Sequence, residues 1–381
     1  MVLALCGILL LIHCLWAGVR TQYYDPGTGG TYWRDDASYY HEAVAIAEAW
    51  GRGEFLPIWH KGSPPYLGTL HVGYHRVLAA GFLVLGKSTF VGLLINALAL
   101  SLLPLLAALS ARYLFTENLE TEESRRPRRH AVDVNATPVW RNTPLMTGML
   151  VAFHPGQFYW SAYLMKDAWT AFCFMATMTL MLGSIRRRSA TLGLGAVFLL
   201  PYLFTVRIYA CASLFFGAML LPGLKIGKQR LFTAAFAGLG VLIILLGYTE
   251  RGNAIFSQMR DSLTALAPAG VDGPVGMLKQ MAAGIPRLFL SPYSWLILPE
   301  PSPMYGMYPG MWYLYLLGYP LAFSGLYAAI KQNLRLAMVP ITAFGVAGLI
   351  FLTAEFGGNA SRQRFYLEPV VLIFAAYGLK Y

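Results

Sequence analysis

Two adjacent carboxylates, Asp35 and Asp36, follow the first apolar run of this 381-residue chain. A carboxylate a few residues beyond a membrane helix lies at the water edge of the bilayer, where it can act as a base on a substrate carried by a lipid. We expect an amphipathic helix over 41–50, directly after the pair. Orphan amides at its start would hold a carboxylate in place and favour the ionised form that a base requires. The alternative is a solvated loop start without a chemical role.

A second carboxylate, Asp167, stands beside Lys166 at the boundary between two apolar runs. As a functional pair, Lys166 would contact a phosphate and Asp167 would orient the acceptor side of a reaction. The alternative is a lysine that extends to the membrane surface, followed by an aspartate that caps the next helix.

Arginines recur at two other run boundaries. Arg207, followed by Tyr209, has no compensating acid near it in the sequence, and Arg362 and Arg364 precede the last apolar run. A lone arginine at the end of a membrane helix commonly binds an anion, although it can also extend to the lipid headgroups. Together with Lys166, these clusters could clamp a lipid phosphate.

Histidines mark the region after the paired carboxylates. His71 and His75 have the i, i+4 spacing of metal ligands, but no third ligand accompanies them. We therefore expect His60 and His75 to be polar lining of a site and assign no metal ligand. No cofactor is certain from the sequence, and a divalent cation is possible.

The composition is that of an integral membrane protein. Hydrophobic residues make up 57% of the chain and charged residues only 12%, compared with about 25% charged in soluble domains. The net charge of +11 comes from basic residues in short loops, which is typical of topology signals and not of a nucleic-acid-binding face. All four cysteines lie in apolar segments, so neither a disulfide framework nor a zinc site is expected.

Hydropathy predicts an all-α polytopic membrane protein that forms one domain over 1–381. Ten runs are long enough to span a bilayer: 1–19, 89–112, 144–163, 168–185, 190–206, 208–222, 231–248, 311–330, 336–353 and 364–379. The first run lacks the basic start and the clear cleavage site of a signal peptide.

The orientation follows from the basic loops at 112–141, 186–188, 225–230 and 331–335. These loops fall on one side if the ambiguous run 67–86 is an in-plane juxtamembrane helix, and basic short loops are cytoplasmic. Both ends are then cytoplasmic. We expect a first outer loop over 20–88, a basic cytoplasmic loop over 113–143 and a large outer loop over 249–310. The candidate residues then share the outer, periplasmic face of a bacterial-type inner (plasma) membrane.

No nucleotide-binding motif and no nucleophile elbow occur in the chain. The energy for a group transfer must therefore arrive stored in the substrate, and a lipid phosphate is the form of donor that suits a membrane.

The chain resembles the GT-C superfamily of integral-membrane glycosyltransferases, which are polyprenyl-phosphate-sugar-dependent and mannosyltransferase-like. Short matching elements occur in order along the whole chain: Asp36 to Tyr40, Gly73-Tyr74 to Leu85-Gly86, Asn96 to Leu98, His154-Pro155 to Lys166-Asp167, Arg207 to Tyr209, and Arg364 to Pro369. The chain is shorter than the protein-mannosylating and lipid-A-modifying branches, so the acceptor stays open.

The resemblance implies an inverting transfer of a sugar to an acceptor hydroxyl or amine. Asp36 would be the base, because Tyr40 falls at the usual offset, and Asp35 is the competing position. Asp167 matches a second outer aspartate of the family.

The same resemblance implies that Lys166, Arg207 and Arg364 stabilise the leaving polyprenyl phosphate. The partners would be a polyprenyl-phosphate sugar, a lipid- or glycan-linked acceptor and membrane lipids, in cell envelope and polysaccharide biosynthesis.

Two other classes remain open. A polysaccharide polymerase or ligase shares the outer arginines but usually carries them in large outer loops. A lipid transporter or flippase should show charges at mid-membrane and repeat symmetry, and neither is evident.

Overall fold

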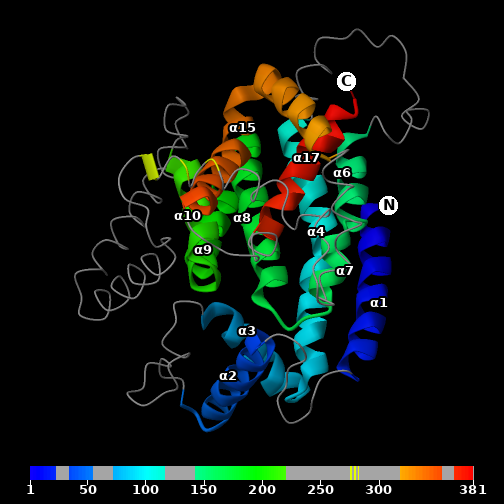
Figure 1. Cartoon of the computed structure of the whole chain (residues 1–381), viewed down its shortest axis with the longest axis vertical. Coiled ribbons are helices and arrows are strands. Elements are labelled where there is room, and N and C mark those ends of the chain that lie inside the picture. Colours follow the sequence, from blue (N-terminus) through cyan, green and yellow to red (C-terminus); the bar gives the residue numbers. More distant parts are fainter. Residues whose placement is uncertain are drawn as a thin grey trace.

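The computed structural model describes residues 1–22, 34–54, 72–115, 142–219, 318–353 and 364–380, together with residues 275, 276, 279 and 282. Within these ranges the chain is helical and contains no strand. Most of the helices run along the long axis of the molecule, and α2 and α3 lie together at one end (Figure 1).

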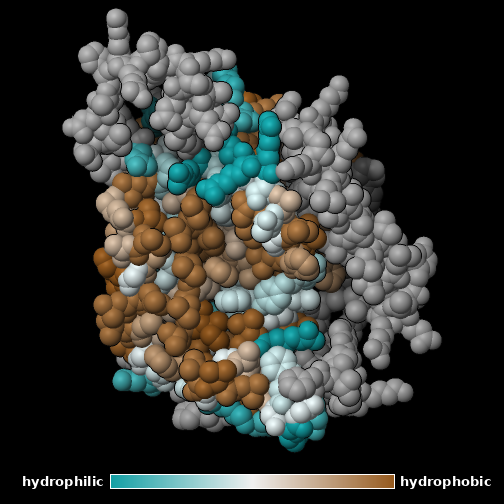
Figure 2. Space-filling view, turned by 180° about the vertical axis from the view of Figure 1, so that it is seen from behind, coloured by the Kyte–Doolittle hydropathy of each residue, from teal (hydrophilic) through white to brown (hydrophobic). Residues whose placement is uncertain are grey.

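Three of the described helices have the length and composition to cross a membrane: α1 (Val2–Thr21), α4 (Thr89–Phe115) and α8 (Lys166–Arg187). They contain 20, 27 and 22 residues, and about 20 apolar residues are needed to span the hydrocarbon core. Figure 2 shows a broad apolar band across one face, with hydrophilic residues gathered toward both ends. Both observations support a membrane protein.

The run expected to span at 144–163 is divided into α6 (Thr143–Ala152) and α7 (Pro155–Ser161). His154 is extended between them, and its side chain caps α7 by accepting a hydrogen bond from the Gly156 amide at 3.2 Å. Proline is suited to a first helical position because it lacks the amide hydrogen that would be orphaned there. The chain therefore restarts its helix at Pro155.

A similar break separates α9 (Ala190–Val206) from α10 (Ile208–Met219). Arg207, between them, has an extended backbone with φ −158° and ψ 105°. This break lies where the sequence predicted a boundary between two spans, and it turns the Arg207 side chain into the protein, where only 2% of it is exposed.

Helix α15 (Tyr319–Thr353) is two helices joined at Asn333, which has φ −155° and ψ 79°. The Asn333 side chain accepts a hydrogen bond from the Leu336 amide at 3.2 Å and so caps the second half. The basic loop expected at 331–335 is therefore a kink within one element. Figure 1 shows α15 folding back at this end of the bundle.

The last described element is α17 (Glu368–Gly378), preceded by the 3-10 turn η7 (Phe365–Leu367). Every residue of α17 is buried, and the helix packs against α15. A Cβ at Gly325 would overlap the Phe374 carbonyl oxygen, and one at Gly378 would overlap the Leu321 carbonyl oxygen. The two backbones can approach this closely only because glycine has no side chain.

Helices α2 (Arg34–Gly51) and α3 (Val72–Leu85) pack against each other. Helix α2 begins seven residues earlier than the predicted start at residue 41, so the paired carboxylates lie in its first turn. Lys87 donates to Glu48 at 2.8 Å, and this bond and the lysine charge lower the pKa of the Glu48 carboxyl below its ordinary value of 4.5.

Candidate functional site

Asp36 is fully buried in the first turn of α2. One turn further along α2, the ring of Tyr39 packs edge-on against Tyr74 of α3, with 5.3 Å between the ring centroids. Glu42 follows, and its Oε2 lies 2.9 Å from Nε2 of His75. These contacts fix the start of α2, and with it Asp36, against the start of α3.

A buried hydrogen-bond chain connects α3 to the start of α8. The Tyr74 hydroxyl donates to Oδ1 of Asn96 in α4 at 3.0 Å. The Asn96 amide in turn donates to the carbonyl oxygens of Tyr163 and Met165, both at 3.0 Å. These carbonyls immediately precede Lys166, so Asn96 sets where α8 begins.

A second connection joins α3 to the end of α9. A Cβ at Gly73 would overlap Oγ1 of Thr205 and would lie 3.1 Å from the Thr205 carbonyl carbon. The Tyr202 hydroxyl donates to the Gly73 carbonyl oxygen at 3.2 Å and accepts a 2.7 Å hydrogen bond from the indole of Trp169 in α8. Helix α3 is thus held directly beside the break that carries Arg207.

Asp167 and Arg207 form a buried ion pair, with 2.9 Å between Oδ1 and Nη2. Their side chains are 1% and 2% exposed. The expectation that Arg207 has no compensating acid is wrong in space: Asp167 supplies it from 40 positions earlier in the sequence. Asp167 is therefore held by a guanidinium, which suits an orienting carboxylate.

Aromatic rings join this ion pair to the start of α17. The guanidinium carbon of Arg207 lies 5.2 Å from the ring centroid of Tyr209. The Tyr209 ring is 6.3 Å from that of Tyr366, which also packs edge-on against Phe174 of α8 at 4.9 Å. Tyr366 is two residues beyond Arg364, so the aromatic cluster beside Arg207 reaches the segment that carries Arg364.

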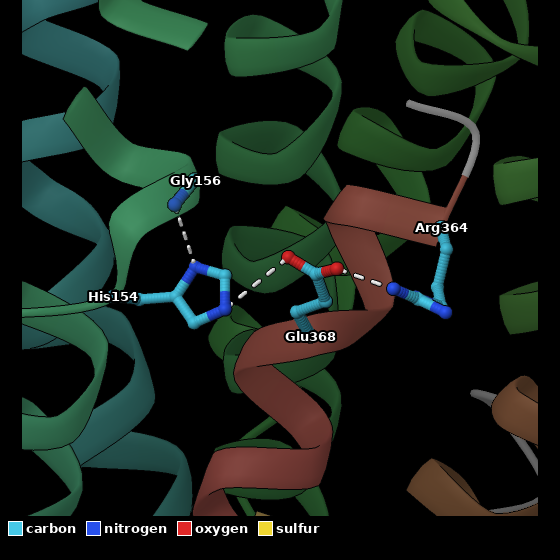
Figure 3. Close-up of polar contacts among 4 residues, drawn as sticks. All are labelled: His154, Gly156, Arg364 and Glu368. Carbon is cyan, nitrogen blue, oxygen red and sulfur yellow. Dashed lines mark hydrogen bonds and ion pairs between the residues drawn. The ribbon is translucent and has the colours of Figure 1, made fainter. Parts of the chain in front are cut away.

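A second buried charged group forms where α17 meets the break between α6 and α7 (Figure 3). Oε1 of Glu368 accepts from Nε of Arg364 at 3.3 Å, and its Oε2 lies 3.5 Å from Nε2 of His154. All three side chains are at most 2% exposed. Because Nδ1 of His154 accepts from the Gly156 amide, the proton of the neutral imidazole is on Nε2, toward Glu368. Glu368 thereby holds Arg364 on one side and His154 on the other.

The remaining predicted residues are spread around these groups. Lys166 is half-buried as the first residue of α8, and Asp35 is in the first turn of α2. The Tyr40 hydroxyl donates to the Lys87 carbonyl oxygen at 3.3 Å, near the far end of α3. His75 is occupied by Glu42, and His60 and Arg362 are outside the described residues.

Three buried polar residues carry this arrangement without having been assigned a role from the sequence: Glu368, His154 and Asn96. Glu368 could have been found, because a carboxylate four residues after an arginine and inside an apolar run is expensive in a membrane and usually functional. His154 and Asn96 lie in elements that carry the GT-C resemblance, but their contacts are with distant segments, so the sequence gave neither residue a role of its own.

Chemically, the site combines a buried carboxylate with two buried guanidiniums, each oriented by its own acid. Guanidinium groups held in this way are suited to a phosphate, because their planar donors match its oxygens. Among the described residues, no group of three histidine, cysteine or carboxylate side chains could hold a metal ion. No protein-family model and no curated protein matches this sequence.

Proposed function

We propose that this protein is an inverting membrane glycosyltransferase that moves a sugar from a polyprenyl phosphate to an acceptor hydroxyl or amine. The observation that carries the proposal is the burial of Asp36, Arg207 and Arg364 at connected helix ends of an apolar, helical chain. Ionisable groups buried in membrane proteins are costly and are retained where they act on a substrate.

In the proposed reaction, the Asp36 carboxylate takes the proton of the acceptor group. The acceptor atom forms a bond to the anomeric carbon as the bond from that carbon to the phosphate oxygen breaks, on the opposite face. The released polyprenyl phosphate carries the new negative charge, which Arg207, Arg364 and the half-buried Lys166 stabilise. Asp167 and Glu368 keep the two guanidiniums oriented during this step.

The membrane layout that accompanies the proposal has ten spanning helices, an in-plane α3 and both chain ends in the cytoplasm. The reaction then takes place at the outer, periplasmic face of a bacterial-type inner membrane. The three long apolar helices and the breaks at Arg207 and Asn333, which lie at expected boundaries between spans, support this layout.

The test is sugar release from a panel of radiolabelled polyprenyl-phosphate sugars by the purified chain in lipid nanodiscs. Wild type is compared with Asp36→Asn at equal folding. Glu54→Gln is the matched control, because Glu54 also follows the first apolar helix but is exposed and pairs with Arg52 at 3.0 Å. We expect wild type and the control to consume one donor and Asp36→Asn to lose this activity.

The other outcomes are equally specific. Full activity in Asp36→Asn would remove Asp36 as the base and move the role to Asp35 or Asp167. Consumption by wild type only after a growing polymer is added would favour a polysaccharide polymerase. No consumption of any donor or polymer would contradict the transferase proposal.

A further inference from the structure

The carboxylate assigned as the base and the ion pair assigned to the phosphate lie on different parts of the molecule. Asp36 is on α2, which packs mainly against α3, and this helix pair lies at one end of the molecule (Figure 1). The ion pair between Asp167 and Arg207 belongs to α8 and to the break between α9 and α10. The position of Asp36 relative to Arg207 therefore depends on how α3 is attached to the long helices.

One hydroxyl group, that of Tyr202, joins α3 to both α8 and α9. Tyr202 lies in α9, five residues before Arg207, and its hydroxyl donates to the Gly73 carbonyl oxygen of α3 at 3.2 Å. The same hydroxyl accepts a 2.7 Å hydrogen bond from the indole of Trp169, which is two residues after Asp167. Three helices thus meet at one side chain that lies within a few residues of both members of the ion pair.

The contact between the backbones of α3 and α9 limits their distance but not their register. A Cβ at Gly73 would overlap Oγ1 of Thr205 and would lie 2.9 Å from Cγ2 of Val206, so the two helices are as close as glycine permits. Such packing resists closer approach, but it does not by itself stop α3 from sliding or rotating about its axis. The hydrogen bond from Tyr202 does, because its strength falls steeply when the angle at the hydrogen departs from linear.

We propose that Tyr202 is a positioning residue that fixes where Asp36 stands relative to the arginines that hold the phosphate. This role rests on the proposed function. The hydrogen bond from Trp169 polarises the hydroxyl and strengthens its own bond to Gly73. Loss of the hydroxyl displaces the base while both guanidiniums keep their acids, and a displacement of about 1 Å can lower a rate by about a hundredfold.

The experiment measures hydrogen–deuterium exchange and donor consumption of the full chain in lipid nanodiscs. We compare wild type with Tyr202→Phe, which orphans no backbone group, because a carbonyl oxygen inside a helix also accepts from the amide four residues later. Trp169→Phe removes the donor to the same hydroxyl and gives the answer if Tyr202→Phe does not fold. The matched control is Tyr113→Phe, because Tyr113 is half-buried and contacts Arg187 through its ring, 5.2 Å from the guanidinium carbon.

In Tyr202→Phe we expect the amides of α2 and α3 to exchange about fivefold to tenfold faster, the factor equivalent to one neutral hydrogen bond. The amides of α15 and α17 should exchange as in wild type. The kcat should fall by about tenfold to a hundredfold and the KM for the donor should stay within about twofold, because the phosphate-binding arginines are unchanged. Trp169→Phe should change exchange and kcat in the same direction but by less, and Tyr113→Phe should match wild type.

Three results would overturn the proposal. Exchange of α2 and α3 as in wild type would show that the hydroxyl does not fix the helix pair. Faster exchange with an unchanged kcat would show that the position of the pair does not limit the transfer, and a higher KM with an unchanged kcat would place the hydroxyl at donor binding. Failure of the proposed function is distinguishable, because wild type would then consume no donor while the exchange data would still decide whether Tyr202 holds α3.

Discussion

Asp167→Asn should destabilise the protein strongly, because it leaves the Arg207 charge buried without its carboxylate. The two atoms that form the ion pair are 2.9 Å apart, which corresponds to an attraction of about 6 kcal/mol at an effective dielectric constant of about 20. The cost of removing both charges from water offsets much of this attraction in the intact pair. Removing one partner leaves the other charge uncompensated, which costs about 3–5 kcal/mol.

The assay is unfolding of the detergent-solubilised chain, followed by the fluorescence of its nine tryptophans. We compare Asp167→Asn, Arg207→Met and the double variant that combines these two substitutions. The double variant should be far more stable than the sum of the single losses predicts, because it leaves no buried charge behind. Glu54→Gln, which breaks an exposed pair, should change stability little.

Additive losses in the double variant would refute the reasoning, because they would mean that the two side chains do not interact. The same variants separate stability from chemistry. A double variant that folds well but consumes no donor would show that the charges serve the substrate, and one that retains full activity would remove Arg207 from the phosphate site.

Three further substitutions test the contacts that build the site. Gly73→Ala should lower the free energy of unfolding by about 1–3 kcal/mol, because the added methyl group overpacks against Thr205, and should also lower donor consumption. The control is Gly7→Ala, which has open space around it and should leave both the unfolding and the activity unchanged. Asn96→Leu breaks three buried hydrogen bonds, and a loss of stability below about 1 kcal/mol would contradict their importance. Glu368→Gln keeps the shape but removes the charge beside Arg364, so we expect weaker donor binding, seen as a higher KM; an unchanged KM would argue against a positioning role.

The boundaries of several helices follow from the sequence because charged residues end the apolar runs. The run 89–112 corresponds to α4 and the run 190–206 to α9, with the latter ending just before Arg207. Hydropathy could not reveal that the run 144–163 is broken, because His154 and Pro155 interrupt a window that stays apolar on average. The kink at Asn333 is also invisible to hydropathy, since it depends on a side-chain cap.

The contacts of the site were harder to predict from the sequence than the helices were. A helix was expected directly after the paired carboxylates, over 41–50, but α2 already begins at Arg34, so Asp36 lies in its first turn. The partnership of Asp167 with Arg207 joins residues 40 positions apart, and that of His154 with Glu368 joins residues more than 200 apart. Periodicity and spacing report only neighbours along the chain, so contacts of this range need the packed structure.

The complete burial of α17 has a consequence for how the protein is made. Helix α17 leaves the ribosome after every other described helix, yet those helices surround it. Where α17 crosses α15, Gly378 faces Gly325, and the two backbones are in direct contact. The earlier helices must therefore leave space for α17 between them until α17 is inserted into the bilayer. Until then His154 lacks the Glu368 carboxylate, so the second charged group of the site forms only after the other described helices have been made.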